Sequence, residues 1–373
     1  MLKKIFIIST IFLMLILVFF GIYIVAFKKT DDRAVISNKI DKEKVDIASV
    51  VSKKITNITS DSVIAATIGP DGETIRYYDG ADGRAWTMTL RGTNRETLIN
   101  ETLGIPKKVK WSPDGNSAIL TYDDKIIVYN FATGTQNKLR DGMDDVVWST
   151  SGGRILYKYY DQNSKERTLN ISNADGTNWK KLADLPFRYT TFVQMPSSIL
   201  AAFWPTADAN VSTQLFTTST LNEGTPKEIF SGKNGADFLF SPDGKKVLVS
   251  YITEGGKKVH LGIMDSNGAN FNDLMIPTIV QKVVWGRDSK TVYYAQPNNA
   301  QDSVLWPNDY LDKKFTTQDT FYKIDITTGK KDRIVELNDI KEKIDAFDLF
   351  LNSSENLLFF INRTNGLLYR IDM

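Results

Sequence analysis

Charged and aromatic residues recur where successive strands of this chain are expected to begin, and their types suit the binding of a polar ligand. These positions are Lys108, Asp145, Arg188, Tyr189, Asp237, Lys282 and Asp345. Charges of both signs occur among them, as a polar or zwitterionic ligand would require, although salt bridges among the residues themselves would produce the same pattern. Paired carboxylates can also cleave glycosidic bonds. A hydrolase or lyase that uses Asp145, Asp237 and Asp345 is therefore the alternative.

Two irregular insertions carry aromatic residues that could extend such a site. The first contains Trp204 and runs to Asn210, and the second, residues 297–319, contains Trp306 and Tyr310. Long loops on a rigid scaffold often bind ligands, and aromatic side chains dominate many binding surfaces. The competing interpretation is that each loop packs its own Trp against the neighbouring strands.

Other catalytic or metal sites find little support. The only histidine, His260, falls within a predicted strand, and no G-x-S-x-G segment is present to hold a nucleophilic Ser. The chain has no cysteine, which excludes zinc sites built from His and Cys. The Asp-containing turn at 173–176 lacks the spacing of a calcium loop. We therefore expect no metal, no cofactor and no enzyme activity.

The elements that would position these residues form a repeat. In residues 111–115, Trp-Ser-Pro-Asp-Gly, Pro presets φ and Gly accepts a positive φ, which predicts a tight turn between two antiparallel strands. Related segments align with Pro113 at Pro70, Thr150, Ser197, Pro242, Arg287 and Asn352. Their separation of mostly about 45 residues, with room for four short strands, is typical of the blades of a β-propeller.

The second half of the repeat supports this alignment. Residues 169–182 and 261–274 agree as a third strand, a Gly turn and a fourth strand. Together with the Trp-Ser-Pro-Asp-Gly turns, they resemble the TolB-like propellers, also called WD40-like or PD40 repeats, over about residues 62–373. The resemblance implies the fold but no single function, because such propellers act as scaffolds, ligand binders and enzyme lids. The Gly-His and Trp-Asp signatures of eukaryotic WD40 repeats are absent, and the chain has no room for the N-terminal α/β domain of TolB.

The predicted fold class is all-β, a seven-bladed β-propeller over residues 54–373, with six blades and irregular ends as the alternative. The last unit provides only three strands, at 346–351, 357–362 and 367–371. Residues 54–59 are strand-like and precede the first unit. We expect them to complete the last blade, which would close the ring and cover an exposed sheet edge.

The N-terminus predicts a membrane anchor. Residues 5–27 carry no charge and are long enough to cross a hydrocarbon core of about 30 Å as one transmembrane helix. Lys3 and Lys4 precede them, which favours a cytoplasmic N-terminus and an extracytoplasmic propeller. A cleaved signal peptide is the rival interpretation. Residues 28–53 are mostly polar and charged, as expected of a solvated stalk.

Charge and composition restrict the partners. The formal net charge is +2, so no basic face for nucleic acid is indicated. Taken together, the sequence predicts a membrane-anchored extracytoplasmic propeller that recognises a protein or glycan of the cell envelope. The oligomeric state is left open.

Overall fold

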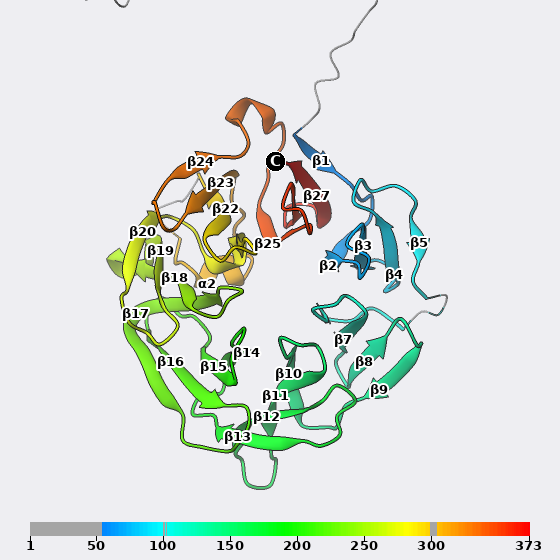
Figure 1. Ribbon diagram of the computed structural model, residues 1–373, viewed down its shortest axis with the longest axis vertical. Helices are drawn as coiled ribbons and strands as arrows, with labels where there is room; N and C mark the ends of the chain where they lie inside the picture. The colour runs from blue at the N-terminus through cyan, green and yellow to red at the C-terminus, as the bar shows by residue number, and fades with distance from the viewer. Residues whose placement is uncertain (1–53, 100, 102, 299–303) are drawn as a thin grey trace, which may run out of the picture. The chain divides into compact units, whose positions relative to one another are not determined.

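The computed structural model describes residues 54–99, 101, 103–298 and 304–373. In this part of the chain, antiparallel strands form five four-stranded sheets and one seven-stranded sheet. Figure 1 shows the sheets side by side in a ring, with their strands following one another from the centre outward. The predicted anchor at 5–27 and stalk at 28–53 lie outside the described residues, within which no helix is long and apolar enough to span a bilayer.

Three four-stranded sheets come first along the chain. They contain β2 (Val63–Ile68), β3 (Thr74–Asp79), β4 (Ala85–Thr89) and β5 (Glu96–Thr97); β6 (Lys108–Trp111), β7 (Ser117–Thr121), β8 (Ile126–Asn130) and β9 (Thr135–Lys138); and β10 (Met143–Trp148), β11 (Arg154–Tyr160), β12 (Arg167–Asn173) and β13 (Lys180–Asp184). In each of these sheets the spatial order of the strands equals their order in the sequence.

The seven-stranded sheet follows. It contains β14 (Thr190–Gln194), β15 (Leu200–Pro205), β16 (Ser212–Ser219), β17 (Lys227–Phe240), β18 (Lys246–Thr253), β19 (Lys258–Asp265) and β20 (Asn272–Ile276). Its middle strand, β17, has 14 residues. The first part of β17 pairs with β16 and the second part with β18. One long strand therefore joins two groups of strands into one sheet.

Two more four-stranded sheets complete the ring. They contain β21 (Val283–Trp285), β22 (Thr291–Pro297), β23 (Asp319–Asp325) and β24 (Lys331–Arg333); and β25 (Ala346–Leu351), β26 (Leu357–Asn362), β27 (Leu367–Asp372) and β1 (Ile55–Asn57). The short helices are η1 (Glu254–Gly256), η2 (Val280–Lys282), α2 (Asn308–Leu311) and η3 (Leu337–Asp339).

The two ends of the described chain share one sheet. Strand β1 pairs antiparallel with β27, with Ile55 opposite Ile371. Beyond β1, the backbone N–H of Ile58 donates to the carbonyl oxygen of Leu368 at 2.9 Å, and the N–H of Leu368 donates to Oγ1 of Thr59 at 2.9 Å. These bonds cover the edge of β27, which would otherwise present unpaired backbone groups.

Tryptophan side chains connect neighbouring sheets at a repeated position. Each stands at the end of the first strand of its sheet, and its Nε1–H donates to a backbone carbonyl of the preceding group of strands at 2.8–3.4 Å. The pairs are Trp111 with Ala65, Trp148 with Lys110, and Trp285 with Leu239. The indole thus fills the space between sheets while its only polar atom is satisfied, which explains why the position recurs.

The alignment of two degenerate units is corrected by one residue. In the unit at Pro113, the residue before the proline closes the turn with a backbone hydrogen bond to the residue five positions ahead of it. Met195 makes this bond in the fourth unit, so Pro196 and not Ser197 takes the place of Pro113. In the last unit Asn352 itself makes the bond. Both turns lack the full Pro-Asp-Gly sequence, and only the fourth unit keeps a proline, Pro196, at the position of Pro113.

Candidate ligand-binding groove

The predicted site residues fall into two groups in the structure. Five have side chains that are almost fully buried: Trp204, Lys282, Trp306, Tyr310 and Asp345. The others reach the surface or are half-buried: Lys108, Asp145, Arg188, Tyr189 and Asp237. Only the second group is accessible from the surface of the molecule.

Lys282 is the centre of a buried ion cluster. Its side chain is 0% exposed, and its Nζ lies 2.6 Å from Oδ2 of Asp319 and 2.6 Å from Oδ1 of Asp345. The same ammonium donates to Oγ1 of Thr317 at 2.9 Å and to the carbonyl oxygen of Ala346 at 2.9 Å. Burial lowers the pKa of Lys282, but the carboxylates outweigh it and hold the pKa above its ordinary value. This lysine is a fixed cation that ties two sheets together.

The carboxylates of this cluster accept further hydrogen bonds, although Oδ1 of Asp319 is buried without a partner among the described residues. Asp345 accepts hydrogen bonds from the hydroxyl of Tyr310 at 2.8 Å and from Oγ1 of Thr317 at 2.9 Å. Burial raises the pKa of Asp345, but Lys282 and these donors outweigh it, so the pKa is lowered. Burial raises the pKa of Asp319, despite its contact with Lys282. The expectation that Lys282 and Asp345 lie open at a channel mouth is therefore corrected.

Asp319 was not among the predicted residues, although it completes the cluster. It stands at the first position of β23 and is the last residue of the second insertion, and its Oδ2 also accepts the backbone N–H of Ala346 at 2.7 Å. Nothing in the sequence distinguished it from the other acidic residues near the insertion. Its role in the cluster is seen only in the structure, where it contacts Lys282, a residue distant from it in the sequence.

Both tryptophans of the insertions are buried, which corrects the expectation that they form an exposed binding surface. Trp306 is 1% exposed and stacks on Tyr310, with ring centroids 5.3 Å apart. Phe315 packs edge-on against Trp306 at 5.1 Å. Trp204 is 1% exposed, and its Nε1–H donates to Oδ1 of Asp237 at 2.8 Å. Each insertion therefore packs its own Trp, as the competing interpretation held.

The remaining predicted acids have separate partners. Oδ1 of Asp145 lies 2.9 Å from Nζ of Lys110, across two neighbouring sheets. Lys108 is exposed at the start of β6. Asp237 accepts a hydrogen bond from Nε2 of Gln281 at 2.5 Å, and burial raises its pKa. The carboxylates that a hydrolase or lyase would combine are thus each held by different groups.

The surface residues Arg188 and Tyr189 border an open groove of about 760 Å³. They lie in the loop between β13 and β14, and Cζ of Arg188 sits 5.2 Å from the centroid of the Tyr189 ring. Tyr189 is 65% exposed, so its ring is available to a ligand. Residues 205–208 with Val211 form a second wall, and Asn308, Leu311 and Asp312 form a third.

The two insertions, distant in sequence, meet at this groove. Oδ1 of Asn308 accepts the backbone N–H of Ala209 at 2.9 Å, and Nδ2 of Asn308 donates to Oδ1 of Asp208 at 3.2 Å. The N–H of Thr206 bonds to the carbonyl oxygen of Tyr189 at 3.0 Å. Helix α2 and the insertion after β15 therefore hold one another in place, and the loop that carries Tyr189 is attached to them.

The comparisons with known proteins bear on the fold. No family model matches the chain, and no curated protein matches it. Among solved structures it is similar to an oligogalacturonate lyase in complex with manganese, with a TM-score of 0.61, 11% identity, and coverage of 86% of this chain and 93% of that one. It is also similar to the β-propeller domain of Myceliophteria thermophila Cps50 (Swd1), with a TM-score of 0.55, 13% identity, and coverage of 86% and 99%.

These likenesses support a β-propeller fold, which agrees with the ring of antiparallel sheets in Figure 1. TolB of Acinetobacter baumannii is matched with a TM-score of 0.45, 13% identity, and coverage of 86% of this chain and 65% of that one. A likeness at that level carries no argument, so the finer resemblance to TolB-like repeats rests on the sequence.

The expectation that the chain is not an enzyme is contradicted, because the structures it matches over most of their length include lyases. At this low sequence identity the likeness shows the fold alone. It does not assign a reaction to this chain. The manganese of the first lyase does not fit here. The described residues contain no group of three or more His, Cys, Asp or Glu side chains that could hold a metal ion.

Proposed function

We propose that this chain is a membrane-anchored, seven-bladed propeller that binds a glycan of the cell envelope in the groove beside Tyr189. In this proposal residues 5–27 anchor the chain, and the propeller lies outside the cytoplasm. The blade count treats the seven-stranded sheet as two blades that share β17. The first part of β17 is then the outer strand of one blade and its second part the inner strand of the next.

The exposed ring of Tyr189 carries the proposal. A sugar presents an apolar C–H face that can pack on an aromatic ring, and its hydroxyls hydrogen-bond to charged side chains. The groove provides such groups in Arg188, Asp208 and Asp312. Its volume of about 760 Å³ lies within the range of about 300–1,000 Å³ that is usual for ligand sites. A tyrosine also offers contact area at low cost in conformational entropy.

The opposite charges around the groove favour a ligand that both donates and accepts hydrogen bonds. Arg188 can bind a carboxylate or a hydroxyl oxygen, whereas Asp208 and Asp312 accept hydroxyl protons. Sugars that combine hydroxyls with an occasional carboxylate meet both demands. A purely cationic or purely anionic partner would be repelled by part of the groove.

The test is direct binding by the full-length chain. Neutral chito-oligosaccharides and acidic oligogalacturonides are titrated against the wild type and Tyr189→Ala, and we expect the variant to bind at least tenfold more weakly. Trp179→Ala is the matched control, because Trp179 is also exposed and lies beneath an arginine, Arg140, at 4.9 Å, yet does not line the groove. Equal losses in both variants, or none, would contradict the proposal.

The same titration examines catalysis. An elimination reaction on oligogalacturonide would produce unsaturated ends, which absorb ultraviolet light. Their appearance with the wild type and not with Tyr189→Ala would make the groove an active site.

The extracytoplasmic location has a separate test. An impermeant amine reagent applied to intact cells should label exposed lysines such as Lys245, and protection of them would contradict that location.

A further inference from the structure

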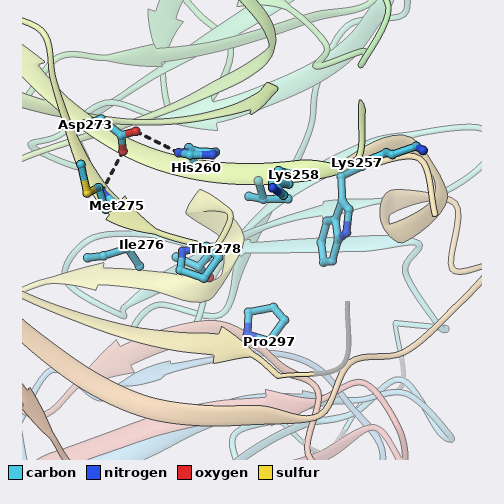
Figure 2. A pocket seen from close by; sticks show the side chains of 11 residues that line it. Lys257, Lys258, His260, Asp273, Met275, Ile276, Thr278 and Pro297 are labelled. Carbon is cyan, nitrogen blue, oxygen red and sulfur yellow. Dashed lines mark hydrogen bonds and ion pairs between the residues drawn. The ribbon is translucent and has the colours of Figure 1, made fainter. Parts of the chain in front are cut away.

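A second cavity, of about 460 Å³, lies beside β19 and β20 and shares no lining residue with the groove. Most of its wall is apolar, and Figure 2 shows Ile276, Thr278 and Pro297 along this wall. Thr278 offers no free hydroxyl proton, because its Oγ1 donates to the carbonyl oxygen of Ala295 at 2.6 Å. The cavity is therefore suited to the apolar body of a small molecule.

The imidazole of His260 lines one end of the cavity and is held in a fixed orientation. Its Nδ1 lies 2.9 Å from Oδ2 of Asp273, an interaction that Figure 2 marks, and its ring centroid lies 5.5 Å from that of Tyr251. Oδ1 of Asp273 accepts the backbone N–H of Met275 at 2.8 Å. Burial raises the pKa of Asp273, but its hydrogen bonds with Met275, His260 and Tyr251 outweigh burial and lower the pKa. The carboxylate is therefore ionised at neutral pH.

The ionised Asp273 determines which nitrogen of His260 carries the proton. A carboxylate can only accept a hydrogen bond, so Nδ1 is the donor, and the other nitrogen of a neutral imidazole, Nε2, is then an acceptor. Nε2 has no hydrogen-bond partner among the described residues, and it is not one of their polar atoms that are buried without a partner. The side chain of His260 keeps 29% of its surface exposed. A molecule in the cavity can therefore reach an acceptor at this end.

The charged groups around the cavity do not favour an anion. Lys258 already takes part in another interaction, and Lys257 is exposed to water. A second negative group beside His260 would lie close to the carboxylate of Asp273 and would find no proton to accept at Nε2. A neutral group that donates a hydrogen bond meets neither obstacle.

We propose that this cavity binds a neutral molecule with an apolar body and one hydroxyl group, of the size of a medium-chain alcohol. The hydroxyl donates its proton to Nε2 of His260, and the apolar body packs on Ile276 and Pro297. The volume of about 460 Å³ lies within the usual range of ligand sites, about 300–1,000 Å³. The site is independent of the glycan groove and stands whether or not the groove binds sugar.

The first experiment observes the ring nitrogens directly by NMR, because His260 is the only histidine of the chain. Full-length protein without a histidine tag, labelled with nitrogen-15 histidine, is titrated at about pH 8, above the ordinary histidine pKa of about 6.5. The titrants are octanol and its methyl ether, which lacks the hydroxyl proton. We expect a protonated Nδ1 and a bare Nε2, whose resonance moves toward that of a protonated nitrogen with octanol only. A protonated Nε2 before addition, no movement with octanol, or the same movement with the ether would overturn the proposal.

The second experiment locates the site by photo-cross-linking. Full-length protein is irradiated with decanol that carries a diazirine at the end of its chain, or with the methyl ether of this probe, and labelled peptides are mapped by mass spectrometry. We expect labels within residues 257–260 and 275–278. The hydroxyl probe should be preferred about fivefold over the ether, the size expected of one neutral hydrogen bond.

Two variants test the hydrogen bond to His260. His260→Phe keeps a ring and removes both nitrogens, so the preference for the hydroxyl probe should disappear. The partition of the probes into detergent is the same for every protein and cancels in this comparison. Lys257→Ala, which removes an exposed lysine of the cavity rim, is the control and should keep the preference. Melting curves identify a variant that fails to fold, and the NMR titration of the wild type then decides. Labels elsewhere, a preference that persists in His260→Phe, or an equal loss in Lys257→Ala would overturn the proposal.

Discussion

The buried cluster around Lys282 and the groove beside Tyr189 are built from the same kinds of residue, yet only the groove can receive a ligand. Lys282 is 0% exposed and contacts two carboxylates at 2.6 Å. Tyr189 is 65% exposed, and the neighbouring Arg188 is exposed as well. A cation, an aromatic ring and acids occur in both places. The difference is that the protein itself supplies the partners in the cluster, whereas in the groove a ligand can supply them.

The comparison indicates how to separate structural from functional charges in such a ring. A buried charge is stable only if its partners are complete, so removal of one partner exposes the full cost of desolvating the other. A surface charge beside a groove has water as its alternative partner, and its removal costs the fold little. Measurements of unfolding free energy should therefore distinguish the buried cluster from the groove without any binding data. Substitutions in the cluster should cost much stability, and substitutions in the groove should cost little.

The largest effect is expected for Lys282→Met, which leaves Asp319 and Asp345 buried without their cation. The free energy of unfolding should fall by about 3–5 kcal/mol, measured by denaturant titration. Lys110→Met is the control, because Lys110 pairs with Asp145 at 2.9 Å but the two side chains are 34% and 27% exposed. It should cost about 1 kcal/mol or less. Similar losses in both variants would remove the distinction.

The next effect is expected for Tyr310→Phe, which keeps the ring that stacks on Trp306 and removes the hydroxyl that donates to Asp345. A hydrogen bond to a charged group is worth about 1.5–3 kcal/mol, and the loss in unfolding free energy should be of that size. Tyr157→Phe is the matched control. Tyr157 is also fully buried, but its hydroxyl has no hydrogen-bond partner among the described residues, so thermal unfolding should show little change or a gain.

A smaller, pH-dependent effect distinguishes Asp345 from Asp237, whose pKa is raised by burial. A carboxyl whose folded pKa is raised stabilises the fold below its unfolded pKa of about 3.9 and loses that contribution as the pH rises. Asp237→Asn should therefore raise stability at pH 7, with the gain vanishing below about pH 4. Asn also keeps an oxygen that can accept the hydrogen bond from Nε1–H of Trp204.

Asp345→Asn should behave in the opposite way, because the folded pKa of Asp345 is lowered. Its contribution is present above the unfolded pKa and is lost as the pH falls through the folded value. The variant should be less stable than the wild type at pH 7, and the difference should shrink in acid. Unfolding curves at several pH values give both results. The same pH dependence for the two variants would show that Lys282 does not set the charge of Asp345.

The smallest effect on stability is expected for Tyr189→Ala, because the side chain is mostly exposed. The unfolding free energy should change by no more than about 0.5 kcal/mol, while glycan binding falls at least tenfold. Calorimetry gives both quantities on one sample. A large loss of stability would place Tyr189 with the structural residues and would end its assignment as a ligand contact.

Several features of the fold could be predicted because their causes are local. The Pro-Asp-Gly letters specify turns, and the Trp before them marks the end of an inner strand, so the repeat could be counted. The turns of the fourth and the last unit were aligned with an error of one residue. In these units, residues other than Pro-Asp-Gly form the same turn, which backbone hydrogen bonds close. Nearly every residue type can make backbone hydrogen bonds, so a turn closed by them alone is not recognisable from its sequence.

The candidate site was predictable only in part. The sequence placed Arg188, Tyr189 and the two insertions on a common face, and the structure brings them to one groove. It could not show that Trp306 packs inward on Tyr310 or that Asp319 completes the pair around Lys282. The residue type of an aromatic side chain in a loop does not reveal whether the side chain faces water or packs in the core.

By itself, the sequence determined the β-rich repeat, its turns and the spacing of its inner strands, because these depend on neighbours a few positions apart. Only the tertiary structure decided which charges are paired and which are free. Lys282 meets Asp345, and Asp208 meets Asn308, across long stretches of chain. Such contacts follow from the closure of the ring, which brings distant segments together, and burial then determines whether a charged group serves the fold or can serve a ligand.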